Sequence, residues 1–227
     1  MNSHKERVLA QIRHQETDPI PYTLSFDCDV ADRLDAYYGG SEWRDRLDNA
    51  IYRLSGPGLG VSAGLARVEA ARKAGVDVDL LPDVRRQDSG ETYYHDAYGS
   101  IWRIDCRPAH LVEPVLKAPS LSGFEFPDID ALLDATWDRE AMWRQVEEQQ
   151  DRFLLIGFGR GLFERSWALR GFENVLMDSV AHEGFFDALI REIAAHQQMV
   201  LERLVDLPVD GIMFSDDWGY QQGVLLG

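Results

Sequence analysis

The sequence predicts an α/β fold organised around a parallel sheet. Residues 153–158 form a continuous apolar run, as expected of a strand that is buried on both faces. A second short apolar run, 211–214, begins after the Leu207-Pro208 break and ends in a polar turn. Segments with helical periodicity separate these runs. Short buried strands that alternate with helices are typical of parallel sheets with helical crossovers.

Four segments have the character of strands in such a sheet. They are 20–26, 76–81, 153–158 and 211–215. Aromatic and β-branched residues on either side of a turn-like centre also predict a β-hairpin insertion over 91–105. Four strands are half of a TIM (β/α)8 barrel, and the last residues, 224–227, are apolar with no polar tail. We therefore expect one barrel domain over 1–227 that is C-terminally incomplete.

Helices are expected between these strands, each with a recognisable start or end. The predicted ranges are 4–14, 30–38, 42–53, 65–74, a segment starting near 127, 137–151, 171–180 and 184–206. Asp27 and Asp29 are expected mainly as N-terminal caps of the helix over 30–38, and Gly39-Gly40 ends it. The histidines at 95, 182 and 196 have no second ligand at a metal-site spacing, so structural or surface positions are expected for them.

Composition excludes some classes of partner. The formal net charge of −16 disfavours nucleic acid and anionic membrane surfaces, both of which attract clustered Lys and Arg. No apolar run approaches the roughly 20 residues of a membrane span. The two cysteines, Cys28 and Cys106, and a polar N-terminus without a signal peptide fit a reducing compartment. A cytoplasmic protein acting on a small molecule is the expectation.

The strongest candidate site is the stretch 209–219. The strand over 211–215 delivers two adjacent carboxylates, Asp216 and Asp217, followed by Trp218. Parallel α/β folds place their chemistry at the C-terminal ends of strands. The competing interpretation is that Ser215 or Asp217 caps a helix starting near Tyr220. Two carboxylates beside a Trp are more than one cap requires, so we favour a site.

A second candidate follows the strand over 153–158. Gly159-Arg160-Gly161 leads into a helical segment with Glu164 and Arg165 in its first turn. The glycines permit close approach of a ligand or tight backbone packing. A surface ion pair between Glu164 and one of the arginines is an equally supported alternative to substrate binding. The glycine-rich segment 55–61 resembles a phosphate loop only weakly, because it lacks a Gly-Lys-Ser/Thr ending, and a flexible loop is expected there.

Several segments together resemble the uroporphyrinogen decarboxylase family. Lys5-Glu6-Arg7-Val8-Leu9 followed by Asp18-Pro19-Ile20-Pro21 is similar to the opening of that family. Asp96 to Arg103 resembles its Asp-x-Tyr/Trp-Gly-x-x-Trp hairpin, and Gly157 to Glu164 resembles its Gly-x-x-Gly-x-Phe-Glu strand end. Val209 to Gly219, followed by Gln221-Gln222-Gly223, resembles its Asp-Asp-Trp-Gly segment. The resemblance covers nearly the whole chain in the family's order.

The resemblance implies a TIM barrel of the uroporphyrinogen decarboxylase type and one of two chemistries. One is decarboxylation of uroporphyrinogen without a cofactor, and the other is methyl transfer involving a corrinoid or methylated donor, a thiol and zinc. The arginine-bearing segment of the decarboxylases is replaced here by 25–30, which carries Asp27 and Asp29 and no arginine. The decarboxylases' serine and histidine are replaced by Asp216 and Asp217. The zinc ligands of the methyltransferase branch would lie beyond Gly227.

We therefore expect an enzyme of this superfamily that leans to the methyltransferase-like branch. The resemblance and the strand ends assign catalytic roles to Asp216, Asp217 and Glu164, and substrate binding to Arg160, Arg165, Trp218 and Phe26. Zinc and a corrinoid are the implied cofactors, with a corrinoid protein and a second copy of the chain as possible partners. The alternatives are a uroporphyrinogen III decarboxylase of porphyrin biosynthesis, which needs no cofactor, and a non-catalytic barrel fragment.

Overall fold

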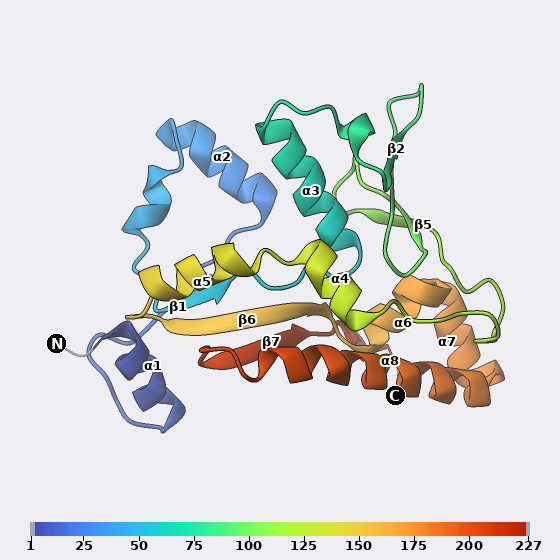
Figure 1. Cartoon of the computed structure of the whole chain (residues 1–227). Helices are drawn as coiled ribbons and strands as arrows, with labels where there is room; N and C mark the ends of the chain where they lie inside the picture. The colour runs from blue at the N-terminus through green and yellow to red at the C-terminus, as the bar shows by residue number, and fades with distance from the viewer. Residues whose placement is uncertain (1–2, 226–227) are drawn as a thin grey trace. The chain divides into compact units, whose positions relative to one another are not determined.

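The computed structural model describes residues 3–225, except for the side chains of Cys28 and Phe158, and has a mixed α/β architecture (Figure 1). The α-helices are α1 (His4–Ile12), α2 (Cys28–Tyr38), α3 (Val61–Lys73), α4 (Ile129–Thr136), α5 (Arg139–Glu148), α6 (Leu162–Arg170), α7 (Phe172–Ala181) and α8 (Glu183–Leu204). Two short 3-10 helices are η1 (Glu42–Arg46) and η2 (Val78–Leu80). Among the described residues no helix has both the length and the apolar character that a membrane crossing requires.

The strands of the described residues form three sheets. The first has the order β1 (Ile51–Leu54), β6 (Phe153–Arg160), β7 (Gly211–Ser215), and β1 pairs with β6 in parallel. The second is an antiparallel meander in the order β2 (Val84–Arg86), β3 (Thr92–His95), β4 (Ile101–Arg103), β5 (His110–Glu113). The third is the small ribbon of β8 (Gly219–Tyr220) and β9 (Gly223–Val224). The strands of residues 3–225 are thus divided among separate sheets and are not hydrogen-bonded into one closed barrel.

The chain divides into two compact units. The first consists of residues 1–55, 139–156 and 208–212, and the second of 56–138, 157–207 and 213–227. In the first unit, Val8, Ala50 and Phe153 are the buried centre of a small apolar cluster. Asp210 joins three parts of the same unit, because its carboxylate accepts hydrogen bonds from the Leu154 amide at 2.9 Å and lies 2.6 Å from Lys5 Nζ.

Two sequence-based expectations in the first unit are wrong. Residues 20–26 form no strand, and the predicted helix over 42–53 is instead η1 followed by β1. Several hydrogen bonds of residues 20–26 involve side chains, and these residues do not form the regular backbone hydrogen bonds of a β-sheet. Asn49 exchanges hydrogen bonds with the backbone of Leu24, and the Ile51 amide donates to Thr23 Oγ1.

In the second unit the meander packs on α3. The core contains Trp102 of β4, Tyr94 of β3 and Val68 of α3, with Ala168 of α6. Gly64 lets α3 approach the sheet, because a Cβ there would lie 2.4 Å from the Tyr94 ring. The predicted strand over 76–81 is wrong. It is η2, whose first residue, Val78, is buried while its neighbours are exposed.

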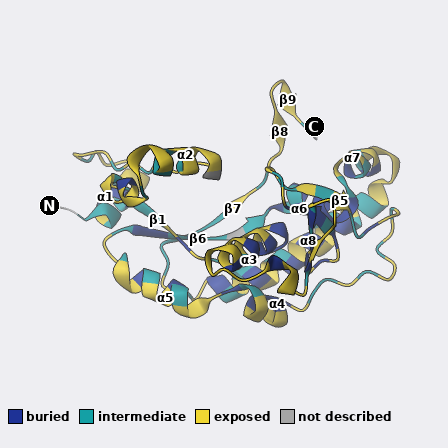
Figure 2. Cartoon of the chain, turned by 90° about the horizontal axis from the view of Figure 1, so that it is seen from above, coloured by how far each residue is buried: buried dark blue, intermediate teal, exposed yellow. Residues whose placement is uncertain are grey.

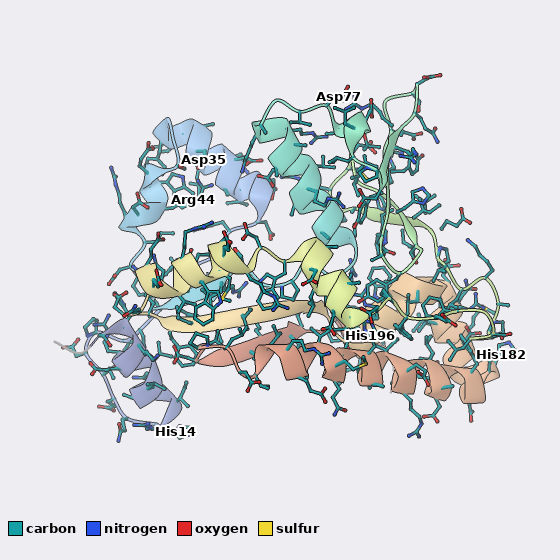
Figure 3. All side chains as sticks on the ribbon, viewed as in Figure 1. His14, Asp35, Arg44, Asp77, His182 and His196 are labelled. Carbon is teal, nitrogen blue, oxygen red and sulfur yellow. The ribbon has the colours of Figure 1, made fainter. Side chains whose placement is uncertain are left out.

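Helices α6, α7 and α8 pack against one another in the second unit (Figure 1). The long helix α8 is amphipathic, and buried and exposed residues alternate around it (Figure 2). Its buried positions repeat at helical spacing at Leu189, Ile193, His196, Val200 and Leu204. The burial of His196, labelled in Figure 3, distinguishes it from the exposed His182 at the start of the helix.

Candidate functional site

The carboxylate of Asp216 caps the N-terminus of α6. Asp216 Oδ1 accepts from the Glu164 amide at 2.7 Å, and Oδ2 accepts from the Phe163 amide at 2.8 Å. The N-cap residue of α6 is Gly161, which has no side chain to do this. Free amides and the helix dipole both favour an anion at this position. The competing interpretation, in which Ser215 or Asp217 caps a helix starting near Tyr220, is wrong, because β8 begins there instead. The residue that caps a helix is Asp216, which was predicted to be catalytic, and that helix lies far back in the sequence.

Gly161 makes this arrangement sterically possible. A Cβ on Gly161 would lie 2.5 Å from both Cβ and Cγ of Asp216. The amide of Gly161 also donates to the carbonyl of Ser215 at 2.7 Å. The end of β7 and the start of α6 are therefore joined by backbone and by side chain, and a larger residue at position 161 would separate them.

A cavity of about 310 Å³ opens beside this junction in the second unit. Its lining comes from the last residues of β6, from the end of β7 and from the first turns of α6 and α3. The lining residues are Ser62, Gly157, Gly159, Arg160, Glu164, Met213 and Ser215. The cavity thus lies at the C-terminal ends of two adjacent strands, where α/β folds place ligands.

Arg160 and Glu164 are the charged residues of this cavity. Arg160 Nη1 and Glu164 Oε1 are 3.3 Å apart, and both side chains are about one-fifth exposed. Burial raises the pKa of Glu164, Arg160 lowers it, and the nearby Asp216 and Asp217 raise it further. A carboxyl group with a raised pKa in a cavity is suited to proton transfer near neutral pH.

The guanidinium of Arg160 is held by aromatic rings. Its Cζ lies 4.5 Å from the ring centre of Trp167 and 5.1 Å from that of Trp102. Its backbone carbonyl accepts from Gln197 Nε2 at 2.8 Å. Burial lowers the pKa of Arg160, partly offset by Glu164. The planar guanidinium is therefore fixed in orientation, as a binding group for a carboxylate or phosphate should be.

The β3–β4 turn supplies that aromatic support through a buried carboxylate. Asp96 Oδ1 accepts from the amides of Tyr98 at 3.0 Å and Ser100 at 2.9 Å, and Oδ2 accepts from Trp102 Nε1 at 2.8 Å. Burial raises the pKa of Asp96, while these hydrogen bonds and Arg165 lower it. The sequence predicts the hairpin, but it gives no sign that Asp96 is buried and holds Trp102 against the guanidinium of Arg160.

The remaining predicted site residues have other surroundings. Arg165 is buried, with its Cζ 4.0 Å from the ring centre of Tyr98, and does not line the cavity. Trp218 donates to Asp216 Oδ2 at 2.6 Å and lines a separate apolar cavity of about 270 Å³ with Phe163 and Phe186. Asp217 is exposed and accepts from the Gly219 amide at 3.4 Å. Phe26 belongs to the first unit, where it contacts Trp43.

The family resemblance implies zinc for the methyltransferase branch, and zinc would need a group of His, Cys, Asp or Glu side chains to bind it. Within residues 3–225, apart from the two side chains left undescribed, no three His, Cys, Asp or Glu side chains come together in a way that would hold a metal ion. These residues by themselves do not fit a zinc site, and we derive no step through zinc.

Arg160 and Glu164, which line the cavity, and Asp216 beside it were predicted from the sequence, whereas the neutral lining residues Ser62 and Met213 were not. The glycine-rich segment before Ser62 was the available signal. Comparison of the chain with protein-family models, with curated proteins and with solved structures finds no match.

Proposed function

We propose that the chain is a uroporphyrinogen decarboxylase-like enzyme that acts on a small anionic molecule in the cavity at the ends of β6 and β7. The observation that carries the proposal is the Arg160–Glu164 pair in that cavity, with Asp216 capping the helix that bears Glu164. Arg160 would bind the anionic group and Glu164 would act as acid or base. Asp216 then has a positioning role in place of direct catalysis.

The proposal includes a more specific fold than mixed α/β, namely a TIM barrel. A uroporphyrinogen decarboxylase-type TIM barrel would place β1, β6 and β7 side by side in one parallel sheet. The parallel pairing of β1 with β6 and the strand order β1-β6-β7 support this assignment. The cysteine usage supports a cytoplasmic location.

Methyl transfer to a thiol is the reaction class we favour. In that reaction the bond between the methyl group and its donor breaks with both electrons remaining on the donor. The methyl group joins the sulfur, and the thiol proton passes to Glu164. The pairing of Glu164 with Arg160 at 3.3 Å supports this role, because Arg160 lowers the pKa of Glu164 and so favours the carboxylate that accepts the proton. The acidic neighbours Asp216 and Asp217 disfavour a substrate with many carboxylates. A corrinoid supplies the methyl group in the family branch that this sequence resembles.

Decarboxylation of uroporphyrinogen III is the second candidate. In this reaction a protonated Glu164 would deliver its proton to the carbon that loses carbon dioxide, while Arg160 binds a neighbouring carboxylate. The raised pKa of Glu164 favours this candidate, because it increases the protonated fraction near neutral pH.

One experiment separates the two reactions. The whole chain is incubated either with methylcobalamin and 2-mercaptoethanol or with uroporphyrinogen III, and thioether and carbon dioxide are measured. Formation of the thioether supports methyl transfer. Release of carbon dioxide makes decarboxylation the favoured reaction instead. If neither product forms, the proposal is overturned.

Variants then test the assignment of residues. Glu164→Gln should lower kcat by about 10²- to 10⁴-fold, the range typical for loss of a general acid or base. Glu147→Gln, on the exposed face of α5, is the matched control and should leave kcat unchanged. Arg160→Lys keeps the charge but loses the planar fork, and should mainly raise KM.

A further inference from the structure

The N-terminus of α3 is buried and has donors without acceptors. Gly60 precedes the helix with φ +77°, and no side chain caps it. Gly60 and Val61 are buried, whereas Ser62 is exposed in the cavity. Within the described part of the chain, the amides of Val61 and Ser62 have no hydrogen-bond acceptor. Buried amides in folded proteins nearly always have a partner.

A buried guanidinium lies against the same turn. Arg165 is 3% exposed, and its Nη1 is 2.9 Å from the position that a Cβ of Gly60 would occupy. Its side chain contacts the face of Tyr98, but among residues 3–225 it makes no hydrogen bond or ion pair. Buried arginines are normally paired, because burying an isolated charge is costly.

The nearby carboxylates already have other partners. Asp96 accepts from two amides and from Trp102, Glu164 pairs with Arg160, and Asp216 caps α6. The charge of Arg165 acts on its surroundings, since it lowers the pKa of Arg160 and of His196 as well as that of Asp96 and Glu164. A buried guanidinium that has no ion pair among the described residues is thus present in a chain whose net charge is −16.

We propose that Arg165 and the first turn of α3 (Gly60, Val61 and Ser62) form an anion site for a carboxylate or phosphate group. The α3 amides and the guanidinium would donate to the anion, as helix N-termini and arginines do in other anion sites. Ser62 Oγ, which donates to the Leu59 carbonyl at 3.4 Å, would exchange that long hydrogen bond for one to the anion. Ser62 connects this site to the cavity of Arg160 and Glu164, so the anion would be one end of the molecule bound there. In that respect the inference rests on the proposed function.

The test is a titration of the whole chain with inorganic phosphate and, separately, with acetate, followed by amide NMR at constant ionic strength. The expected result is saturable shifts of the Gly60, Val61 and Ser62 amides in one of the two titrations, which also identifies the group as phosphate or carboxylate. Absence of saturable shifts at these amides in both titrations overturns the site.

Variants localise the binding. Ser62→Glu places a carboxylate at the helix N-terminus, so it should raise Tm and weaken the anion by at least about tenfold through competition. Arg165→Met, which keeps volume without charge, should weaken binding by about tenfold or more, because hydrogen bonds to charged groups are strong. Arg72→Met, an exposed arginine near the end of α3, is the control and should bind as the wild type does.

The outcome also separates this site from the proposed function. If Arg160→Gln abolishes phosphate or acetate binding and Ser62→Glu does not, the anion binds at Arg160 alone and the α3 site is overturned while the proposed function stands. If anion binding follows Ser62 and Arg165 but no reaction is catalysed, the α3 site stands and the proposed function fails. Ser62 is exposed, so its variant remains informative even where Arg165→Met does not fold.

Discussion

Asp216 Oδ1 accepts a hydrogen bond from the backbone amide of Glu164 at 2.7 Å, although the two residues are 52 positions apart in the chain. The same carboxylate binds the amide of Phe163, so the end of β7 fixes the first turn of α6. Glu164 is therefore positioned by a residue that the sequence presents as a catalytic candidate. This relationship leads to predictions about stability and about the titration of Glu164.

Removing the Asp216 carboxylate should destabilise the fold. Asp216→Ala leaves two amides of α6 without their acceptor, and loss of an N-terminal cap typically costs about 1–2 kcal/mol. The free energy of unfolding from urea titration measures this. Asp217→Asn is the matched control, because Asp217 is exposed and makes one local hydrogen bond. Equal losses for the two variants would show that Asp216 does not act as a cap.

Position 161 should tolerate a side chain only when Asp216 is replaced by glycine. In Gly161→Ala the new Cβ meets Asp216 Cβ and Cγ at 2.5 Å, and overpacking of this kind costs about 1–3 kcal/mol. Because the clash includes Cβ of Asp216, Asp216→Gly should relieve it and Asp216→Ala should not. A double-mutant cycle by urea unfolding measures the coupling. Additive effects of Gly161→Ala and Asp216→Gly would contradict the geometry.

The elements with a continuous apolar run or a helical period were predictable from the sequence, because these patterns are local, although β7 is only partly buried and includes the exposed Phe214. The apolar runs at 153–158 and 211–215 are β6 and β7, and the helical periodicity of 171–180 and 184–206 corresponds to α7 and α8. Asp216 as a cap of α6 was not predictable, since its partners lie more than 50 residues away and leave no local pattern.

The two segments whose secondary structure was predicted wrongly, 42–53 and 76–81, have physical explanations. In 42–53 the apolar residues have helical spacing, but Asn49 binds the backbone of Leu24 and the chain turns there into β1. In 76–81 alternation predicts a strand, whereas Asp77 caps a 3-10 turn by accepting from the Asp79 amide at 3.2 Å. In both segments a polar side chain makes hydrogen bonds to the backbone that the predicted element does not include.

Glu164 should titrate above the usual 4.5 of a glutamate. A carboxyl whose pKa is raised by folding binds its proton more tightly in the folded state. Its contribution to stability is therefore present at low pH and lost as pH rises from 4.5 through the folded pKa. Urea unfolding between pH 4 and 7 should show wild type losing stability relative to Glu164→Gln over that window.

Arg160→Met should raise the pKa of Glu164 further, because Arg160 lowers it, and carboxyl NMR measures this shift. A pKa of Glu164 at or below 4.5 in the wild type would contradict the expected pH dependence, and an unchanged pKa in Arg160→Met would contradict the expected effect of Arg160.

His196 should make the fold sensitive to acid, which is the opposite pH dependence to that of Glu164. Its ring lies 4.8 Å from the ring centre of Phe126 and 5.6 Å from that of Tyr98, and Nε2 lies 3.3 Å from the Pro127 carbonyl. Because that carbonyl is an acceptor, the ring nitrogen facing it carries the proton in the neutral form. Burial lowers the pKa of His196 below 6.5, Arg165 lowers it further, and the Pro127 hydrogen bond opposes both.

A histidine whose pKa is lowered by folding favours the folded state above its unfolded pKa. Its contribution is present above pH 6.5 and is lost as pH falls through the folded pKa, because the unfolded chain binds the proton more readily. His196→Gln keeps a donor for Pro127 and should reduce the loss of unfolding free energy between pH 6.5 and 5. His182→Gln, an exposed position at the start of α8, should retain the full loss. An unchanged pH profile in His196→Gln would mean that other groups cause the acid sensitivity.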